Sequence, residues 1–167
     1  MKFKAVSLCL TVALLAISVF AQGRGKAEAM INGKKISIDY GRPNWGGQDR
    51  LAEAPVGFIW RLGKDMATHI ETTGDLTVAG KAVAAGKYSL WAKRTGENSW
   101  ALLFNPKTGV WGAPELKDGF IAEAPLKLER TSSSTDLLTI SLAEAKGKAA
   151  IKIQWGNAVL SGSFDVK

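Results

Sequence analysis

The sequence of 167 residues contains a single cysteine, Cys9, and that residue lies in a leader that we expect to be removed. Without it the chain has neither a disulfide nor a thiolate, which excludes a disulfide framework and thiol chemistry. Stability must come from a hydrophobic core instead. Residues 22–167 are long enough to bury roughly 68–70% of their unfolded surface as one domain.

The leader has the three parts of a secretory signal peptide. Lys2 and Lys4 form a basic start, residues 5–20 are apolar, and Val19 and Ala21 occupy the positions that a signal peptidase reads. An apolar run of about 16 residues is short for a membrane span. We therefore predict a signal peptide over residues 1–21 with cleavage after Ala21. The mature protein would be secreted or periplasmic, with no membrane span left after cleavage.

Basic residues are not concentrated anywhere in the chain. The formal net charge of +7 falls to +5 without Lys2 and Lys4, and the remaining lysines and arginines are spread over turns and strand faces. Proteins that bind nucleic acids usually carry a basic stripe interleaved with aromatic residues. The sequence therefore predicts no nucleic-acid partner, and at most a weak attraction to anionic polymers of the envelope.

Catalytic motifs are absent as well. The chain has no Gly-x-Ser-x-Gly elbow of a serine hydrolase and no glycine-rich phosphate loop that leads into a helix. A glycosidase would need two facing carboxylates. The 15 acidic residues stand mostly in turns, and their spacing in sequence cannot pair them across a sheet. These absences weigh mildly against an enzyme, and the sequence indicates no cofactor.

The residues that are present repeat with the period of β-strands. From Tyr88 to Ala92 every second side chain is apolar, and Trp91 faces the other way. Similar short runs, separated by glycine turns, recur along the chain, and no long stretch of the mature chain has a helical period. They predict an all-β fold, namely a single antiparallel β-sandwich, or a flattened barrel, of about nine or ten strands.

Turn residues set the expected boundaries at the start of the domain. Asn32-Gly33 suits the type I′ turn of a hairpin, because both positions need a positive φ. Residues 22–34 are therefore expected to hold a polar lead-in, residues 22–26, and the first strand. Residues 35–167 are expected to form the sandwich domain.

Three further predictions concern local structure. Residues 49–54 are expected to form one or two helical turns. The strand over residues 100–104 is apolar on both faces, which predicts a place in the middle of the sheet. The Ser/Thr cluster at residues 131–135 and the pair Gly156-Asn157 are each expected to be turns that join two strands.

Several short motifs follow one another between residues 36 and 166. They are Tyr40-Gly41-Arg42-Pro43, residues 55–63 ending in Trp60-Arg61-Leu62-Gly63, Ala67-Thr68, residues 85–90, Trp100, Phe104-Asn105, Trp111-Gly112 and Trp155. In this order they resemble a family of uncharacterised exported bacterial proteins, the domain of unknown function DUF2911. The resemblance implies a small β-sandwich-like domain in the envelope or outside the cell, and no established activity.

The chain departs from the family pattern at two places. The pattern usually has Gly-Ala-Asn where this chain has Gly63-Lys64-Asp65, so a neutral amide is replaced by a carboxylate. After Trp111 and Gly112 the pattern often has a tyrosine, whereas this chain continues with residues 113–116, Ala-Pro-Glu-Leu. If that region binds a ligand, the ligand of this protein can differ from that of its relatives.

Two arginines next to aromatic residues suggest a binding site. Arg42 follows Tyr40 closely, and Arg61 follows Trp60. An arginine fork over an aromatic ring can hold a carboxylate, a phosphate or a sugar acid. Alternatively, each arginine ties loop carbonyls or a nearby acid and so holds an irregular crossing between sheets. The candidate ligand-binding residues are Tyr40, Arg42, Trp60, Arg61, Asp65, Thr68, Asn105 and Trp111.

The tryptophans divide into two groups. Alternation places Trp100 and Trp155 in the core, whereas Trp45 and Trp111 stand in turns flanked by glycine. Exposed indoles on the rim of a sandwich can stack on sugars or capture peptides. The other interpretation is that these outer tryptophans, with Trp91, form a second small cluster under the long loops.

His69 is the single histidine of the chain and raises the possibility of a metal site. Glu71 lies on the same face of its strand and Asp65 lies just upstream. Alternate residues of a strand are about 6.6 Å apart, so His69 and Glu71 could reach toward one divalent ion. No further histidine or cysteine supplies a ligand, and a lone histidine on an outward face is ordinary.

The sequence thus leads to a fold and to two functional hypotheses. The first is a non-enzymatic binding or structural module of the bacterial envelope, whose partner is an unknown small molecule, glycan or protein. The second is a metal-assisted hydrolase that uses His69, Glu71 and Asp65, with a bound divalent metal. The hydrolase needs these three groups to converge within roughly 3 Å of one point, whereas the binding module needs an open pocket of aromatic and arginine side chains.

Overall fold

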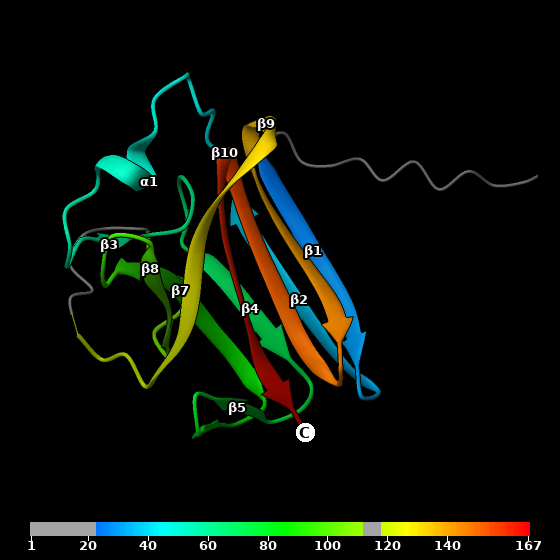
Figure 1. Ribbon diagram of the computed structural model, residues 1–167. Coiled ribbons are helices and arrows are strands. Elements are labelled where there is room, and N and C mark those ends of the chain that lie inside the picture. The colour runs from blue at the N-terminus through cyan, green and yellow to red at the C-terminus, as the bar shows by residue number, and fades with distance from the viewer. Residues whose placement is uncertain (1–22, 112–117) are drawn as a thin grey trace, which may run out of the picture.

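The computed structural model describes residues 23–111 and 118–167. The predicted signal peptide at residues 1–21 and the departure from the family pattern at residues 113–116 lie outside the described residues. The described chain forms one antiparallel sheet of ten strands, which confirms the all-β prediction (Figure 1). The sheet is continuous in the order β1-β2-β4-β7-β8-β9-β10-β5-β6, with β3 paired to β7, and it is not closed into a barrel.

The elements have the following bounds: β1 (Arg24–Ile31), β2 (Lys34–Gly41), α1 (Arg50–Glu53), β3 (Ile59–Trp60), β4 (Thr68–Thr72), β5 (Leu76–Val78), β6 (Lys81–Val83), β7 (Gly86–Arg94), β8 (Ser99–Asn105), β9 (Ala122–Ala145) and β10 (Lys148–Val166). Strand β8 lies between β7 and β9, so the predicted central place of residues 100–104 is confirmed. The short helix predicted over residues 49–54 is α1, whose N-cap Asp49 accepts a hydrogen bond from the amide of Ala52.

The first hairpin has the predicted turn. Asn32 and Gly33 have φ of 50° and 74°, as a two-residue type I′ turn requires. The first strand, however, begins earlier than expected. Arg24 already pairs with Gly41, so residues 24–26 belong to β1 rather than to a lead-in. The polar side chains of this segment lie on the outward face of a strand, where they do not interrupt the ladder.

Two predicted turns are corners inside long strands. Residues 131–135 lie within β9, and Gly156-Asn157 lies within β10, so the prediction of two separate strands at each place was wrong. Figure 1 shows β9 rising along β8, bending over at the top, and descending beside β1. The register of β9 and β10 shifts on both sides of Gly156. Bulges of this kind bend a strand without ending it, which lets one sheet fold over onto itself.

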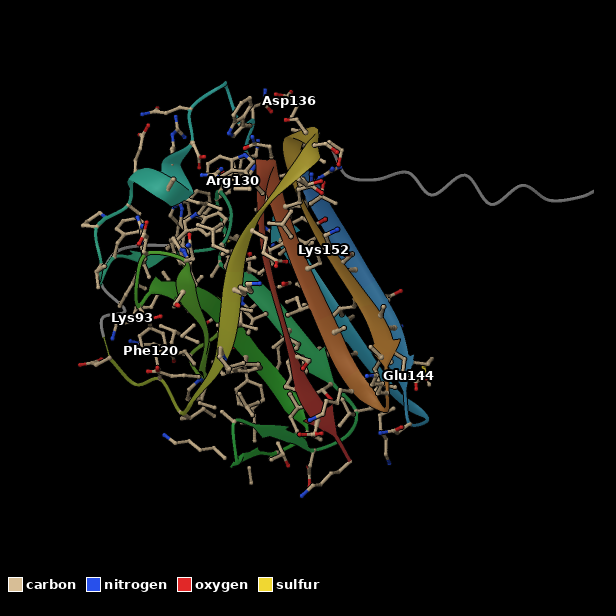
Figure 2. All side chains as sticks on the ribbon, in the orientation of Figure 1. Lys93, Phe120, Arg130, Asp136, Glu144 and Lys152 are labelled. Carbon is tan, nitrogen blue, oxygen red and sulfur yellow. The ribbon has the colours of Figure 1, made fainter. Side chains whose placement is uncertain are left out.

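The corner of β9 is polar because it lies at one end of the sandwich. Residues 129–137 are exposed or half-buried, whereas buried and exposed residues alternate before that stretch. Figure 2 shows Arg130 and Asp136 at this end and Glu144 near the opposite end, by the turn into β10. Polar, exposed residues at a bend resemble a loop in sequence, which explains the wrong prediction.

The core lies between the two folded-over faces. It includes Tyr88, Leu90 and Ala92 of β7, as their alternation predicted. Trp91 points to the outer face, where a second cluster of buried residues packs against Val110 and Phe120 from the segment between β8 and β9. A second apolar cluster under a long loop is therefore present, and it explains why the neighbouring strand β8 is apolar on both faces.

No helix in the described part of the chain is long and apolar enough to cross a membrane. The helix α1 has four residues. It covers the open end of the sandwich beside β3, and its Leu51 is buried. The short helix thus acts as a cap over that end of the core.

Candidate functional site

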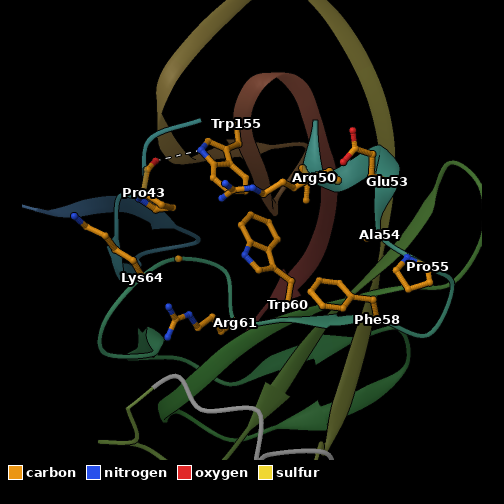
Figure 3. Close-up of a pocket in the computed structure, with 12 residues that line it drawn as sticks. Pro43, Arg50, Glu53, Ala54, Pro55, Phe58, Trp60, Arg61, Lys64 and Trp155 are labelled. Carbon is orange, nitrogen blue, oxygen red and sulfur yellow. Dashed lines mark hydrogen bonds between the residues drawn. The ribbon is translucent and has the colours of Figure 1, made fainter. Parts of the chain in front are cut away.

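The first candidate site is an aromatic pocket between α1, β3 and the corner of β10. Its volume is about 450 Å³, within the range of small-molecule sites. Figure 3 shows the residues that line it. Its apolar walls are made by Pro43, Leu51, Pro55, Phe58, Trp60 and Trp155. We call this cavity the aromatic pocket.

Two stacked indoles form one wall of the aromatic pocket. The rings of Trp60 and Trp155 are nearly parallel, with centroids 5.6 Å apart and an interplanar angle of 9°. Trp155 lies at the bulge of β10, and its Nε1 donates a hydrogen bond of 3.1 Å to the carbonyl of Pro43. A bulge re-aims the side chain that it carries. Here the bulge and the hydrogen bond together fix the indole of Trp155 against β3.

Cations outnumber acids around this pocket. Arg50 places its guanidinium carbon 5.6 Å from the ring centroid of Trp155, within the range of a cation–π contact. Arg61 and Lys64 lie on one side of the stacked indoles, and Glu53 lies on the other (Figure 3). Glu53 is the single acidic residue that lines the pocket among those described, and it accepts a hydrogen bond from the side chain of Gln48. The pocket therefore favours an anionic ligand.

The loop that carries Arg61 and Lys64 has an unusual backbone. Leu62 and Asp65 have φ of 53° and 60°, in the left-handed region that few residues other than glycine adopt. Asn and Asp adopt it more readily than most, so Asp65 fits the backbone position at which the family pattern has Asn. Thr68, which is fully buried, donates from Oγ1 to the carbonyl of Leu62 at 2.7 Å. The candidate residue Thr68 thus holds the loop and does not line the pocket.

Glycines pack this loop against β2. A Cβ on Gly63 would lie 2.8 Å from the carbonyl oxygen of Gly41, and a Cβ on Gly41 would collide with the backbone of Lys64. Only residues without side chains allow the two segments to approach so closely. The position of the Lys64 backbone is therefore determined by the fold, even though its side chain is long.

Arg94 holds the short helix that lines the pocket, a role that the sequence analysis did not predict. Its guanidinium donates to the carbonyls of Ala52 and Ala54 at the end of α1, and to those of Gly96 and Glu97 after β7. These helix carbonyls would otherwise lack partners. Arg94 thus ties the capping helix to strand β7.

A second cavity lies at the same end of the sandwich, between the edges of β1 and β9. Its volume is about 620 Å³, and its lining includes Arg24, Lys26, Tyr40, Arg42, Asn44 and Lys64. Among its described lining residues none is acidic. We call this cavity the basic groove. Lys64 lines both cavities, and Pro43 of the aromatic pocket stands between Arg42 and Asn44 of the basic groove.

Tyr40 and Arg42 connect strands at the basic groove. The hydroxyl of Tyr40 accepts from the amide of Ile140 at 3.0 Å and donates to its carbonyl at 3.3 Å. Arg42 donates from Nε to the carbonyl of Leu138 at 3.0 Å and from Nη2 to Oγ1 of Thr139 at 3.2 Å. Arg42 therefore ties the backbone at an irregular crossing, which is the second of the two alternatives considered for the arginines.

The remaining candidate residues lie apart from both cavities. Asp65 is exposed and lines neither cavity. Asn105 is buried, donates to the carbonyl of Asp118 at 3.0 Å and accepts from the amide of Lys107 at 2.9 Å, so it holds the segment after β8. Trp111 is 62% exposed and forms an isolated bridge with Met66. Of the eight candidates, Trp60 and Arg61 line the aromatic pocket, and Tyr40 and Arg42 line the basic groove.

His69 lies on the outer face of β4, beneath the segment after β8. Its Nε2 accepts a hydrogen bond of 3.2 Å from the amide of Gly109. Burial lowers the pKa of His69, and the nearby charges of Lys87 and Arg24 lower it further, while Asp39 opposes the shift. The neutral imidazole is thus the form that the folded protein stabilises.

The described residues do not assemble the acidic and histidine groups of a metal site. Glu71 is exposed on β4, while His69 is buried. In residues 23–111 and 118–167, no group of three or more His, Cys, Asp or Glu side chains could hold a metal ion. The arrangement around His69 is that of a support for the backbone of the Gly109 segment.

Three residues of the aromatic pocket escaped sequence reasoning. Trp155 was assigned to the core, which is correct since it is 5% exposed, but it also forms a wall of the pocket. Arg50 carried no sequence signal that set it apart from other surface residues, and Phe58 lay within the family motif of residues 55–63 but was not among the candidate residues. Lys64 did carry a signal, because it replaces alanine at a departure from the family pattern.

Comparisons with known proteins agree with the motif order. A family model described as "Protein of unknown function (DUF2911)" matches residues 23–164. This range includes nearly all of the ten-stranded sheet and all the residues that line the two cavities. Searches of curated proteins and of solved structures found no match to the chain. The chain belongs to the DUF2911 family.

Proposed function

We propose that the protein is an exported binding module of the bacterial envelope, whose aromatic pocket holds a small organic anion with a flat apolar face, such as a sugar acid. One observation carries the proposal: stacked indoles and other apolar side chains form a concave wall, and Arg50, Arg61 and Lys64 surround it, whereas Glu53 is the single carboxylate among the described lining residues. Aromatic rings bind the apolar faces of sugars, and arginine forks bind carboxylates.

The proposal rests on the pocket rather than on His69. The hydrolase hypothesis needs His69, Glu71 and Asp65 to converge, and the described residues show no such group. By contrast, one of the two predicted pairs of an aromatic residue and an arginine, Trp60 and Arg61, lines this cavity. Export follows from the predicted signal peptide and is part of the proposal.

A matched pair of ligands tests the proposal. The protein, purified from the periplasm without chelator, is titrated calorimetrically with D-galacturonate and with the neutral methyl galactoside. We expect galacturonate to bind roughly tenfold more tightly, because charge-assisted hydrogen bonds are about twice as strong as neutral ones. Native mass spectrometry of the same preparation would detect a ligand that copurifies. Equal binding of the two sugars, or no binding of either, would contradict the proposal.

Variants of exposed residues test whether galacturonate binds in the aromatic pocket. Phe58 is 43% exposed and lines the pocket, whereas Val56 is 66% exposed and does not. Phe58→Ala should weaken galacturonate binding, and Val56→Ala should leave it unchanged. Arg61 also has an interaction within the protein, so Arg61→Gln is needed to distinguish ligand binding from a purely structural role of this side chain. A variant that unfolds more easily but binds normally would show that Arg61 only braces the loop.

A further inference from the structure

The two cavities share walls. Lys64 lines both, and the segment of residues 42–44 contributes Pro43 to the aromatic pocket and its two neighbours to the basic groove. A ligand longer than the aromatic pocket could therefore extend past Lys64 toward the basic groove. We infer that the two cavities form one extended site for a linear polyanion, an acidic oligosaccharide with a carboxylate on each sugar. This inference rests on the proposed function and specifies its ligand.

The groove exists because the sheet stays open. Strand β1 pairs with β2 alone, so its outer edge faces β9 without a ladder. In place of a ladder, Tyr40 and Arg42 reach across to the backbone of β9. Gly25 makes this crossing possible, because a Cβ there would lie 2.6 Å from the ring of Tyr40. The result is a polar groove between two strand edges, which the side chains of Tyr40 and Arg42 cross.

The cations of the groove differ in the ion pairs and hydrogen bonds that they already form within the protein. Arg24 pairs with Asp39, and Lys26 pairs with Glu28 at 2.7 Å. The hydrogen bonds to β9 engage two of the five N–H groups of Arg42, which leaves donors for a ligand.

Lys64 stands at the junction of the two cavities. Within the described part of the chain it makes no hydrogen bond or ion pair. An ammonium without a partner at the point where both cavities meet can bind an anionic group from either side. Its backbone is held in place by the close contact with Gly41. Lys64 and Arg42 are thus the charges that we expect to contact the second anionic group of the ligand.

Ligand length provides the first test. Calorimetric titration with galacturonate, its dimer, tetramer and hexamer should show a gain in affinity with length. We expect the tetramer to bind roughly 10- to 100-fold more tightly than the monomer, because a second, linked contact profits from a high effective concentration. Tripolyphosphate serves as a second probe, because it carries several anionic groups without a sugar.

A charge variant provides the second test. Asn44 is exposed, lines the basic groove and does not line the aromatic pocket. Asn44→Glu places a negative charge in the groove and should weaken tetramer binding about three- to fivefold while leaving monomer binding unchanged. Asn98→Glu is the matched control, because Asn98 is also exposed and lines neither cavity. Lys64→Gln should weaken both ligands, since Lys64 lines both cavities.

The outcomes separate this inference from the proposed function. If Phe58→Ala weakens monomer binding but the tetramer binds no more tightly than the monomer, the extended site is overturned and the proposed aromatic pocket stands. Equal effects of Asn44→Glu and Asn98→Glu on the tetramer also overturn it. Tripolyphosphate that binds as tightly as the tetramer, and is equally sensitive to Asn44→Glu, overturns the assignment to a saccharide. Failure of the monomer to bind at all overturns the proposed function itself.

Discussion

The hydroxyl of Tyr40 on β2 holds both backbone groups of Ile140 on β9, accepting from its amide at 3.0 Å and donating to its carbonyl at 3.3 Å. These residues are a hundred positions apart in sequence, and no strand ladder joins their segments. One side chain therefore supplies, at this place, the pair of hydrogen bonds that a neighbouring strand would otherwise provide.

Tyr40→Phe should destabilise the fold. The change leaves the buried amide and carbonyl of Ile140 without partners, which we expect to lower the free energy of unfolding by about 1–3 kcal/mol. Urea denaturation followed by tryptophan fluorescence measures the loss. Tyr88→Phe is the control, because the hydroxyl of Tyr88 makes a single hydrogen bond, to the carbonyl of Ala84. A Tyr40 variant no less stable than the Tyr88 variant would contradict this role of the Tyr40 hydroxyl.

Gly25→Ala should be destabilising through the same contact. The new Cβ would lie 2.6 Å from the Tyr40 ring and 2.9 Å from Cδ of Arg42, so both side chains must shift. We expect a loss of about 1–3 kcal/mol, as for other overpacked sites. Gly96→Ala is the control, because its Cβ would lie 3.5 Å from Cβ of Ser99. In the double variant with Tyr40→Phe, the total loss of unfolding free energy should be smaller than the sum of the two single losses.

Arg94→Lys should loosen the cap over the aromatic pocket. A lysine cannot reproduce the fork that holds the carbonyls of Ala52 and Ala54, so α1 loses its tie to β7. We expect the free energy of unfolding to fall by about 1–3 kcal/mol and galacturonate to bind more weakly. Arg130→Lys, at a partly exposed ion pair with Asp49, is the control and should change neither quantity appreciably, because lysine keeps the charge. Unchanged binding by the Arg94 variant would show that the helix does not shape the site.

His69 should make the protein sensitive to mild acid. Its folded pKa is lowered, chiefly by burial, so the unfolded chain binds the proton more readily. The stabilising contribution is therefore complete above the unfolded pKa of about 6.5 and is lost as the pH falls from there through the folded pKa. Unfolding free energies measured between pH 5 and 7.5 should fall with acidity in the natural protein. His69→Gln should flatten the curve in this window, and an unchanged slope would contradict the assignment.

Much of the fold could be predicted from the sequence because strand alternation and turn chemistry are local. The type I′ turn at Asn32-Gly33 depends on two residues, and the two faces of β7 depend on a repeat of period two. The corners of β9 and β10 could not be predicted. A bend within a strand and a turn between strands use the same polar residues, and only pairing with the partner strand distinguishes them.

The candidate site was predicted in part. Trp60 and Arg61 are neighbours in sequence and line the same pocket, whereas Asp65 and Trp111 lie outside it. Trp155 looked like a core residue because its alternation is that of a buried position. Its second role comes from the bulge at Gly156, which turns the indole against Trp60. No sequence pattern within either segment predicts that Trp155 stacks on Trp60.

The sequence by itself determined most of the strands, which faces are apolar, and which family the chain resembles, because these depend on residues close to one another along the chain. The tertiary structure decided where the sheet bends, that β1 and β9 meet without a ladder, and that Lys64 lies between two cavities. These features depend on contacts between distant segments. Their energies come from close packing at glycines such as Gly25 and Gly41 and from hydrogen bonds such as that of Tyr40, which no local pattern encodes.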